Sequence, residues 1–171
     1  MLTAFKEQLR TLAADPKDGF HVKIRKRVGK RATLLLEKRL ERTILLMPGL
    51  VARIYRHWRE ETASGEVKKL GGFLLTYLYH PADFLPEKVH GLFGYLDDAY
   101  LVLGVYEKVV RDVSMNGAKL SDWDKKFLEE FPLLRKSVRQ VIPDEAEKVD
   151  ALIQGIGEGR NEVFESLFSE V

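Results

Sequence analysis

Apolar residues recur at every third or fourth position along almost the whole chain, which is the spacing of one face of an α-helix. The alternation of apolar and polar residues that would indicate a half-buried strand is not sustained over any useful length. At 171 residues the chain has the size of one domain with a sizeable core. We therefore expect an all-α fold, a single-domain bundle of about seven to nine helices.

Residues 1–66 are expected to form basic N-terminal helices. After a short first helix, the apolar spacing predicts one long helix from Phe20 to Pro48, where the proline ends or kinks it because it has no backbone N–H. A further helix follows and ends near Gly65. The buried stripe of the long helix is expected to comprise Val28, Leu35, Leu36, Leu40, Ile44 and Met47.

Residues 67–113 contain the two most apolar segments of the chain, at about 67–79 and 94–113. Both are long enough for a helix, and the sequence between them is rich in proline and glycine. We expect the two segments to pair as a central apolar helical hairpin.

Residues 114–171 are expected to form acidic C-terminal helices. Ser121 followed by Asp124 resembles a capping box, with aspartate in place of glutamate, and predicts a helix start. Pro132 and Pro143 indicate later breaks. The helices expected after these breaks span about 133–141, 144–154 and 160–168.

Charge is divided unevenly along the chain. Residues 1–70 hold 17 Lys and Arg against 8 Asp and Glu, whereas residues 71–171 hold 11 against 18. Such asymmetry can indicate an anionic partner for the basic part, either nucleic acid or a membrane surface. It is equally typical of two halves that attract each other within one fold.

The chain contains no cysteine, which excludes disulfides, thiolate metal sites and cysteine nucleophiles. The N-terminal segment has charges at Lys6, Glu7 and Arg10 and no apolar run of signal-peptide length. Acids or prolines interrupt the apolar windows well before the roughly 18 residues of a membrane-spanning helix. We therefore expect a cytoplasmic protein, with peripheral attachment to the inner face of the membrane as an option.

The segment KIRKRVGKR, residues 23–31, is the densest basic region of the chain. Its cations could contact the phosphates of a nucleic acid, or an anionic membrane at about 1 kcal/mol for each basic residue near the surface. It contains no aromatic residue for base stacking, so nucleic acid is the less favoured ligand. A solvated helix face that pairs with acids of the same domain is the alternative. The residues of this surface are Lys23, Arg25, Lys26, Arg27, Lys30 and Arg31.

The sequence YHPADFLP, followed after a short spacer by GYLDDA, is a motif at the centre of the hairpin. It resembles the YkvA-like family, a short bacterial and archaeal helical domain of unknown function, over about residues 68–108. His80 stands where the family usually has serine, and Glu87 stands where it has aspartate. The resemblance implies the fold of this segment and no activity. The motif residues that match are Pro81, Asp83, Pro86, Gly94, Asp97 and Asp98.

The structural interpretation of the motif gives each acid a local role. Pro81 suits the first turn of a short helix, and Asp83 would accept hydrogen bonds from the free amides there. Gly94 would allow a close backbone approach, and Asp97 and Asp98 fall in the first turn of the next apolar helix. The tyrosines whose hydroxyls could bond these carboxylates are Tyr77, Tyr79, Tyr95, Tyr100 and Tyr106.

A metal site is the minority interpretation of the same motif. One helical face would carry His80, Asp83, Glu87 and His90, and Asp97 or Asp98 would return across the hairpin. Two imidazoles with carboxylates suit zinc, manganese or iron. Pro86 argues against it, because a helix from His80 to His90 would be broken there.

Nothing in the sequence indicates a catalytic residue or a cofactor. The glycine-rich segment 154–161 lacks the preceding strand and the lysine of a phosphate-binding loop, and no serine lies in a nucleophile elbow. The sequence therefore favours a non-enzymatic helical interaction or adaptor domain with a basic surface and an unidentified protein partner. Binding to anionic membrane is the alternative, followed by nucleic-acid binding or the metal site.

Overall fold

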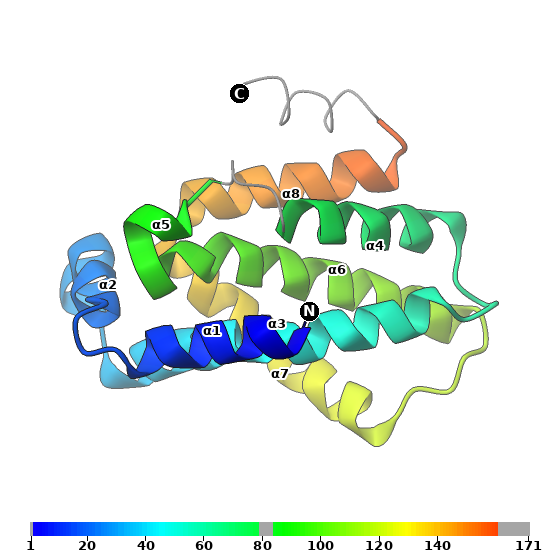
Figure 1. Ribbon diagram of the computed structural model, residues 1–171. Coiled ribbons are helices and arrows are strands. Elements are labelled where there is room, and N and C mark those ends of the chain that lie inside the picture. Colours follow the sequence, from blue (N-terminus) through cyan, green and yellow to red (C-terminus); the bar gives the residue numbers. More distant parts are fainter. Residues whose placement is uncertain (1, 79–83, 161–171) are drawn as a thin grey trace.

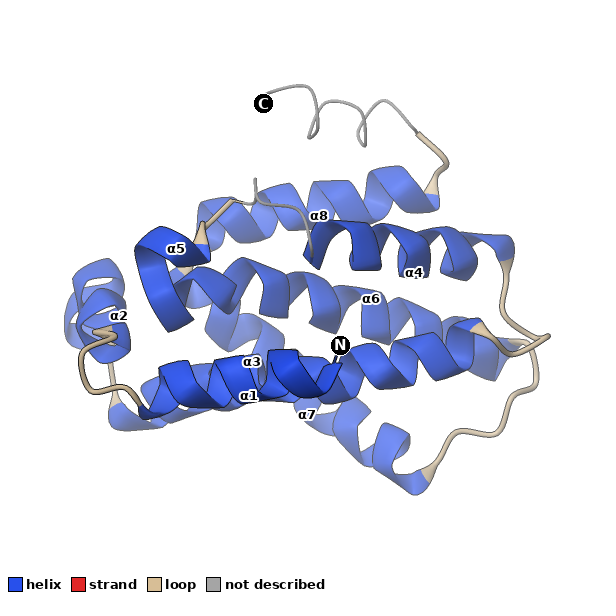
Figure 2. Ribbon diagram, viewed as in Figure 1, coloured by secondary structure: helices blue, strands red, loops and turns tan. Residues whose placement is uncertain are grey.

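A computed structural model describes residues 2–78 and 84–160, and within these ranges it contains helices and no strands, so the predicted all-α class is confirmed (Figure 2). Motif residues His80, Pro81 and Asp83, and the helix expected at 160–168, lie wholly or almost wholly outside the described residues. The helices are α1 (Leu2–Ala14), α2 (Phe20–Val28), α3 (Leu34–Trp58), α4 (Gly65–Leu78), α5 (Glu87–His90), α6 (Leu96–Met115), α7 (Asp122–Val141) and α8 (Pro143–Gly157), with short 3₁₀ helices η1 (Gly29–Arg31) and η2 (Gly91–Tyr95).

Helix α6 is the centre of the bundle (Figure 1). Every residue from Leu96 to Tyr106 is buried, because α3, α4, α7 and α8 all pack against this helix. Such burial on all sides explains why its sequence is apolar around the whole circumference rather than on one stripe. Helices α4 and α6 contact each other directly, as the expected central hairpin requires.

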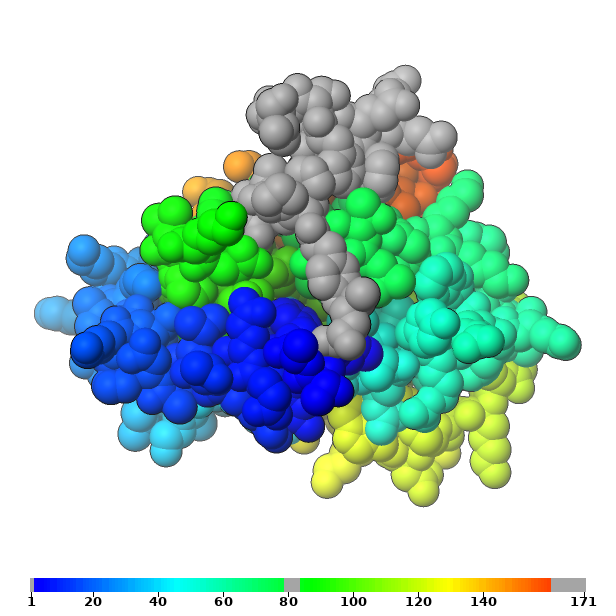
Figure 3. All heavy atoms as spheres, in the orientation of Figure 1, coloured from blue at the N-terminus to red at the C-terminus, as the bar shows by residue number. Residues whose placement is uncertain are grey.

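Helix α1 packs on α3 and contacts η2, the segment that precedes α6. Its dark blue atoms border the green atoms of the α5 region in Figure 3. The Phe5 and Tyr95 rings lie 5.9 Å apart, and the side-chain amide of Gln8 donates to the Tyr95 hydroxyl at 2.8 Å. The N-terminal helix therefore covers η2, which carries part of the motif.

The single long helix expected from Phe20 to Pro48 was a wrong prediction. Gly29 ends α2 with φ of 57°, and Thr33 caps α3 by accepting the N–H of Leu36 at 3.1 Å. Leu35 follows this break on the outward side and is exposed, although the remainder of the expected stripe is buried. A continuous periodicity had concealed a change of direction at Gly29.

The helix ends expected at Pro48 and Pro132 were also wrong predictions, because α3 and α7 each continue through their proline. A proline inside a helix removes one backbone hydrogen bond and clashes with the preceding turn, at about 3 kcal/mol. Both helices bury apolar faces against α6, and this packing offsets the local penalty. By contrast, Pro143 begins α8, and the capping box of Ser121 and Asp124 is present.

Ion pairs join the basic and acidic parts of the chain. The Arg27, Arg42 and Arg53 guanidinium groups lie within 3.0 Å of a carboxylate oxygen on α7 or α8. The carboxylates belong to Glu145, Glu130 and Asp124 respectively. Part of the charge asymmetry is therefore neutralised inside the fold.

Candidate functional site

The motif acids that the structure describes lie at the beginning of α6. Asp97 and Asp98 occupy the first turn of this helix, and both side chains are buried. Free backbone N–H groups and the helix dipole favour a carboxylate at this end. These positions agree with a local structural role for the two aspartates.

Asp97 connects α4 to α6 and to the segment between them. Its Oδ2 accepts the hydroxyl of Tyr77 at 3.2 Å and the backbone N–H of Phe84 at 3.2 Å. Tyr77 is one of the tyrosines that the sequence nominated. Of the others that are described, Tyr95 accepts a hydrogen bond from Gln8, Tyr100 donates to Asp150 and Tyr106 donates to Asp124.

Glycines allow the tight path between α5 and α6. Gly91 has φ of 57°, a conformation that glycine adopts without strain. A Cβ on Gly94 would lie 2.7 Å from the Cα of Glu87 and 2.8 Å from the carbonyl oxygen of Leu85. Pro86 is the residue that precedes α5, where the sequence had placed a break. The segment therefore depends on a close approach of two backbones.

The metal hypothesis falls largely on residues outside the described part of the chain, since it needs His80 and Asp83. Of its other members, Asp97 is buried and bonded to Tyr77, and the His90 ring packs 6.3 Å from that of Phe93. Within residues 2–78 and 84–160, no three histidine or acidic side chains are arranged to hold a metal ion. The hypothesis stays a prediction, for which metal analysis of untagged protein is the measurement.

Replacing Asp98 by alanine is expected to lower the free energy of unfolding by about 2 kcal/mol, because a buried carboxylate at the helix start is lost. Replacing Glu87, which is only half-buried, is expected to change it by less than about 0.5 kcal/mol. Urea denaturation of both variants measures the difference. Equal losses would contradict a structural role for the acid.

Half of the nominated basic surface is fixed within the fold. The Lys23 ammonium donates to the backbone carbonyls of His90 at 2.7 Å and Asp18 at 2.9 Å. The Arg25 guanidinium pairs at 2.8 Å with the buried Glu37, whose pKa this hydrogen bond lowers. Arg27 pairs with Glu145 on α8. These three cations therefore have structural partners.

Lys26, Lys30 and Arg31 form the other half and are exposed. No side-chain hydrogen bond or ion pair to other described residues is found for them, and they follow one another along the end of α2 and η1. Val22 precedes them and Leu34 follows them along the chain, and these aliphatic side chains are 61% and 62% exposed. We call these five residues the α2–α3 corner.

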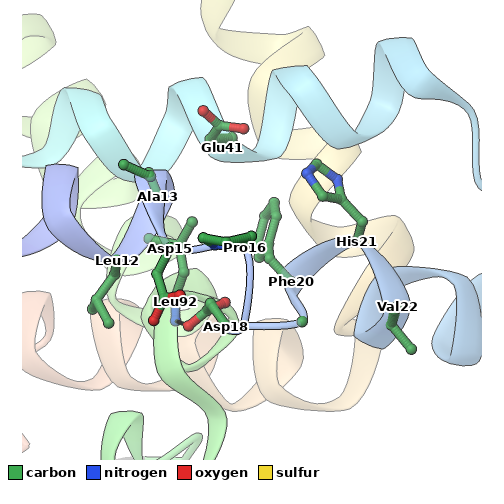
Figure 4. Close-up of a pocket in the computed structure, with 12 residues that line it drawn as sticks. Leu12, Ala13, Asp15, Pro16, Asp18, Phe20, His21, Val22, Glu41 and Leu92 are labelled. Carbon is green, nitrogen blue, oxygen red and sulfur yellow. Dashed lines mark hydrogen bonds between the residues drawn. The ribbon is translucent and has the colours of Figure 1, made fainter.

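A cavity of about 190 Å³ lies between the α1–α2 connection, α3 and η2 (Figure 4). Its lining combines apolar side chains with carboxylates, and no lysine or arginine contributes to it. Asp18 connects the α1–α2 connection to η2, because its Oδ1 accepts the N–H of Leu92 at 2.8 Å. The acidic lining disfavours an anionic ligand. The cavity lining includes Leu12, Asp15, Asp18, Phe20, Glu41 and Leu92.

A buried polar cluster around Asp124 was not anticipated from the sequence. Asp124 Oδ1 accepts the Tyr106 hydroxyl at 2.6 Å and the Arg53 Nη1 at 3.0 Å, and Oδ2 accepts the Ser121 hydroxyl. The Nε2 of His57 lies 3.8 Å from Oδ2. This group, which we call the Asp124 cluster, links α3, α6 and α7. Only the capping box at Ser121 was visible in the sequence, since nothing there pairs Asp124 with residues about 20 to 70 positions earlier.

Aromatic rings cover the Asp124 cluster on one side. The Arg53 guanidinium lies 3.7 Å from the Trp123 ring centroid, and Trp123 stacks on Phe127 at 4.9 Å. Burial and the neighbouring Asp124 raise the pKa of Tyr106. Burial alone would raise the pKa of Asp124, but hydrogen bonds from Ser121 and Tyr106 and the charge of Arg53 outweigh it and lower that pKa. The cluster therefore holds a carboxylate anion in the protein interior.

Comparison with known proteins reaches one segment of the chain. Residues 67–104 match the family model described as "Protein of unknown function (DUF1232)", and this range covers most of α4, the motif and the first half of α6. This match confirms the resemblance to a helical domain of unknown function. No curated protein and no solved structure matches the chain. Among the described helices, none has both the length and the hydropathy required to cross a bilayer.

Proposed function

We propose that this protein is a non-enzymatic adaptor that docks on anionic membrane surfaces through the α2–α3 corner. The matched family has no assigned function, so the proposal is made from geometry alone. One observation carries it: three exposed cations that form no ion pair with another described residue lie, along the chain, between two exposed aliphatic residues. Cations attract acidic lipid headgroups, and protruding aliphatic side chains insert shallowly among them.

Nucleic acid is the second candidate and fits this corner less well. Single-stranded nucleic acid is bound by cations together with aromatic side chains that stack on the bases. At the α2–α3 corner the aromatic Phe20 is buried, and the protruding side chains Val22 and Leu34 are aliphatic. Aliphatic groups add affinity for lipid and none for phosphates, so the combination favours a membrane.

Vesicle co-sedimentation tests the proposal. Wild-type protein is expected to bind vesicles of mixed phosphatidylcholine and phosphatidylserine, and to bind less as salt is added, because salt screens the charges. Changing Lys26, Lys30 and Arg31 together to glutamine should weaken binding roughly 100-fold, at about 1 kcal/mol for each cation. Leu34→Ser should weaken binding without altering its salt dependence.

The matched control changes three exposed lysines elsewhere, Lys68, Lys119 and Lys126, to glutamine. This control removes the same charge and should bind several-fold tighter than the corner variant. Equal losses in the two variants would show that net charge alone drives binding and would overturn the proposal. Binding to a short RNA or DNA duplex but not to vesicles would favour the second candidate.

A further inference from the structure

A groove on the surface of the bundle lies between α3 and α7, which pack against each other. It has a volume of about 300 Å³, and a second hollow of about 230 Å³ adjoins it along α3. The two hollows share Lys38 and Arg42, so they continue along the outer face of α3. The apolar lining is Leu35, Leu133 and Leu134 in the first and Leu45 and Leu46 in the second.

Two leucines of the groove are exposed, one on each wall. Leu35 is 65% exposed and Leu133 is 50% exposed, although both helices bury their opposite faces against the core. Exposed apolar side chains on both walls of one groove are typical of a surface that a partner covers. We use the name α3–α7 groove for this surface.

The charge of the α3–α7 groove is positive. Three cations, Lys38, Arg39 and Arg42, line it against two acids, Glu130 in the first hollow and Glu41 in the second. Arg42 pairs with Glu130 at 2.7 Å, and Arg39 donates to the neutral hydroxyl of Ser137 at 3.3 Å. Among the described residues, Lys38 and Arg39 therefore have no ion-pair partner, and an acidic partner would supply one.

The chain itself contains a segment of this chemistry outside the described residues. The sequence NEVFESLFSEV, residues 161–171, has three glutamates and no lysine or arginine. Its apolar residues recur at the spacing of one helical face, which is the pattern that a helix uses to bind in a groove. Those residues are Val163, Phe164, Leu167, Phe168 and Val171.

We propose that residues 161–171 of a second copy of this chain bind in the α3–α7 groove, with their glutamates against Lys38 and Arg39 and their apolar residues against Leu35 and Leu133. A second copy is favoured over the same molecule because of where the described chain ends. Helix α8 packs on α4, α6 and α7, and its described end lies beside α4, since a Cβ on Gly159 would lie 3.6 Å from the Lys69 Nζ. The described chain thus ends beside α4 and not at the groove, which favours a contact between two molecules.

Sedimentation velocity of the full-length chain, from low micromolar to several hundred micromolar, tests the proposal. The wild-type protein is expected to self-associate with concentration. Lys38→Glu in the groove and Glu165→Lys in the segment should each weaken association at least about tenfold, because each places like charges together. Combining the two substitutions restores an opposite pair and should recover much of the association.

Lys68→Glu is the control, since it reverses an exposed charge on α4, away from the groove, and should leave association unchanged. Leu133→Ser should also weaken association, because the exposed side chain contributes apolar contact and not fold stability. Circular dichroism melting checks that each variant is folded. A monomer at every concentration overturns the proposal, as does association that Lys38→Glu and Lys68→Glu weaken equally.

Discussion

Replacing Asp124 by alanine is expected to lower the free energy of unfolding by about 3–5 kcal/mol, the largest effect of any single acid described here. Asp124 is 2% exposed and accepts hydrogen bonds from Tyr106, Arg53 and Ser121. Removal of the carboxylate leaves the partly buried Arg53 without its counter-charge and the buried Tyr106 hydroxyl without an acceptor. It also removes half of the capping box that begins α7.

Asp122 provides the matched control, because it lies in the same first turn of α7 but its side chain is fully exposed. Asp122→Ala should change the free energy of unfolding by less than about 0.5 kcal/mol. Urea denaturation followed by circular dichroism measures both variants. If Asp124→Ala were no less stable than Asp122→Ala, the Asp124 cluster would not hold the three helices together.

The same carboxylate should make stability depend on pH. The pKa of Asp124 is lowered in the folded protein, so the unfolded chain binds its proton at higher pH than the folded one does. The stabilisation is fully present above the unfolded pKa, near about 3.9, and is lost as the pH falls through the folded pKa. The stability difference between the wild type and Asp124→Asn should therefore shrink below about pH 4.

Helix periodicity predicted the bundle but not the positions of its breaks. The spacing of apolar residues predicts which face of a helix is buried, and the structure does bury Leu36, Leu40 and Ile44 on α3. Whether a proline ends a helix depends on packing that is distant in sequence, which is why α3 and α7 continue through Pro48 and Pro132. Local chemistry was decisive where no packing opposed it, as at the Ser121 capping box.

The candidate site was also predicted only in part from the sequence. The sequence correctly located Asp97 in the first turn of α6, because dipole and amide effects act within one turn. It could not tell that Arg25 pairs with Glu37 whereas Lys26 beside it pairs with no described residue, since the partner depends on how α2 lies against α3. Of the six cations nominated from the sequence, only three therefore remain in the α2–α3 corner. The three-dimensional structure is needed to distinguish cations that pair with an acid on a neighbouring helix from cations that contact only solvent.

Gly94→Ala is expected to lower the free energy of unfolding by about 3 kcal/mol, a large effect for the addition of one methyl group. The new Cβ would lie 2.7 Å from the Glu87 Cα and 2.8 Å from the Leu85 carbonyl oxygen. Both are backbone atoms of the segment around α5, so no side chain can rotate to relieve the contact. Relief requires that α5 move away from η2.

Gly72 is the control, because it lies inside α4 and its Cβ position is open. Gly72→Ala should raise the free energy of unfolding by about 0.5–1 kcal/mol, since alanine favours a helix more than glycine does. The change from glycine to alanine is thus expected to lower the free energy of unfolding at Gly94 and to raise it at Gly72, although both residues lie in the segment that matches the family model. Urea midpoints of the two variants measure this contrast, and destabilisation by Gly72→Ala equal to that by Gly94→Ala would contradict it. The contrast would assign Gly94 to backbone packing. If Gly94 served only to contact a ligand, its substitution would weaken ligand binding and leave the unfolding midpoint unchanged.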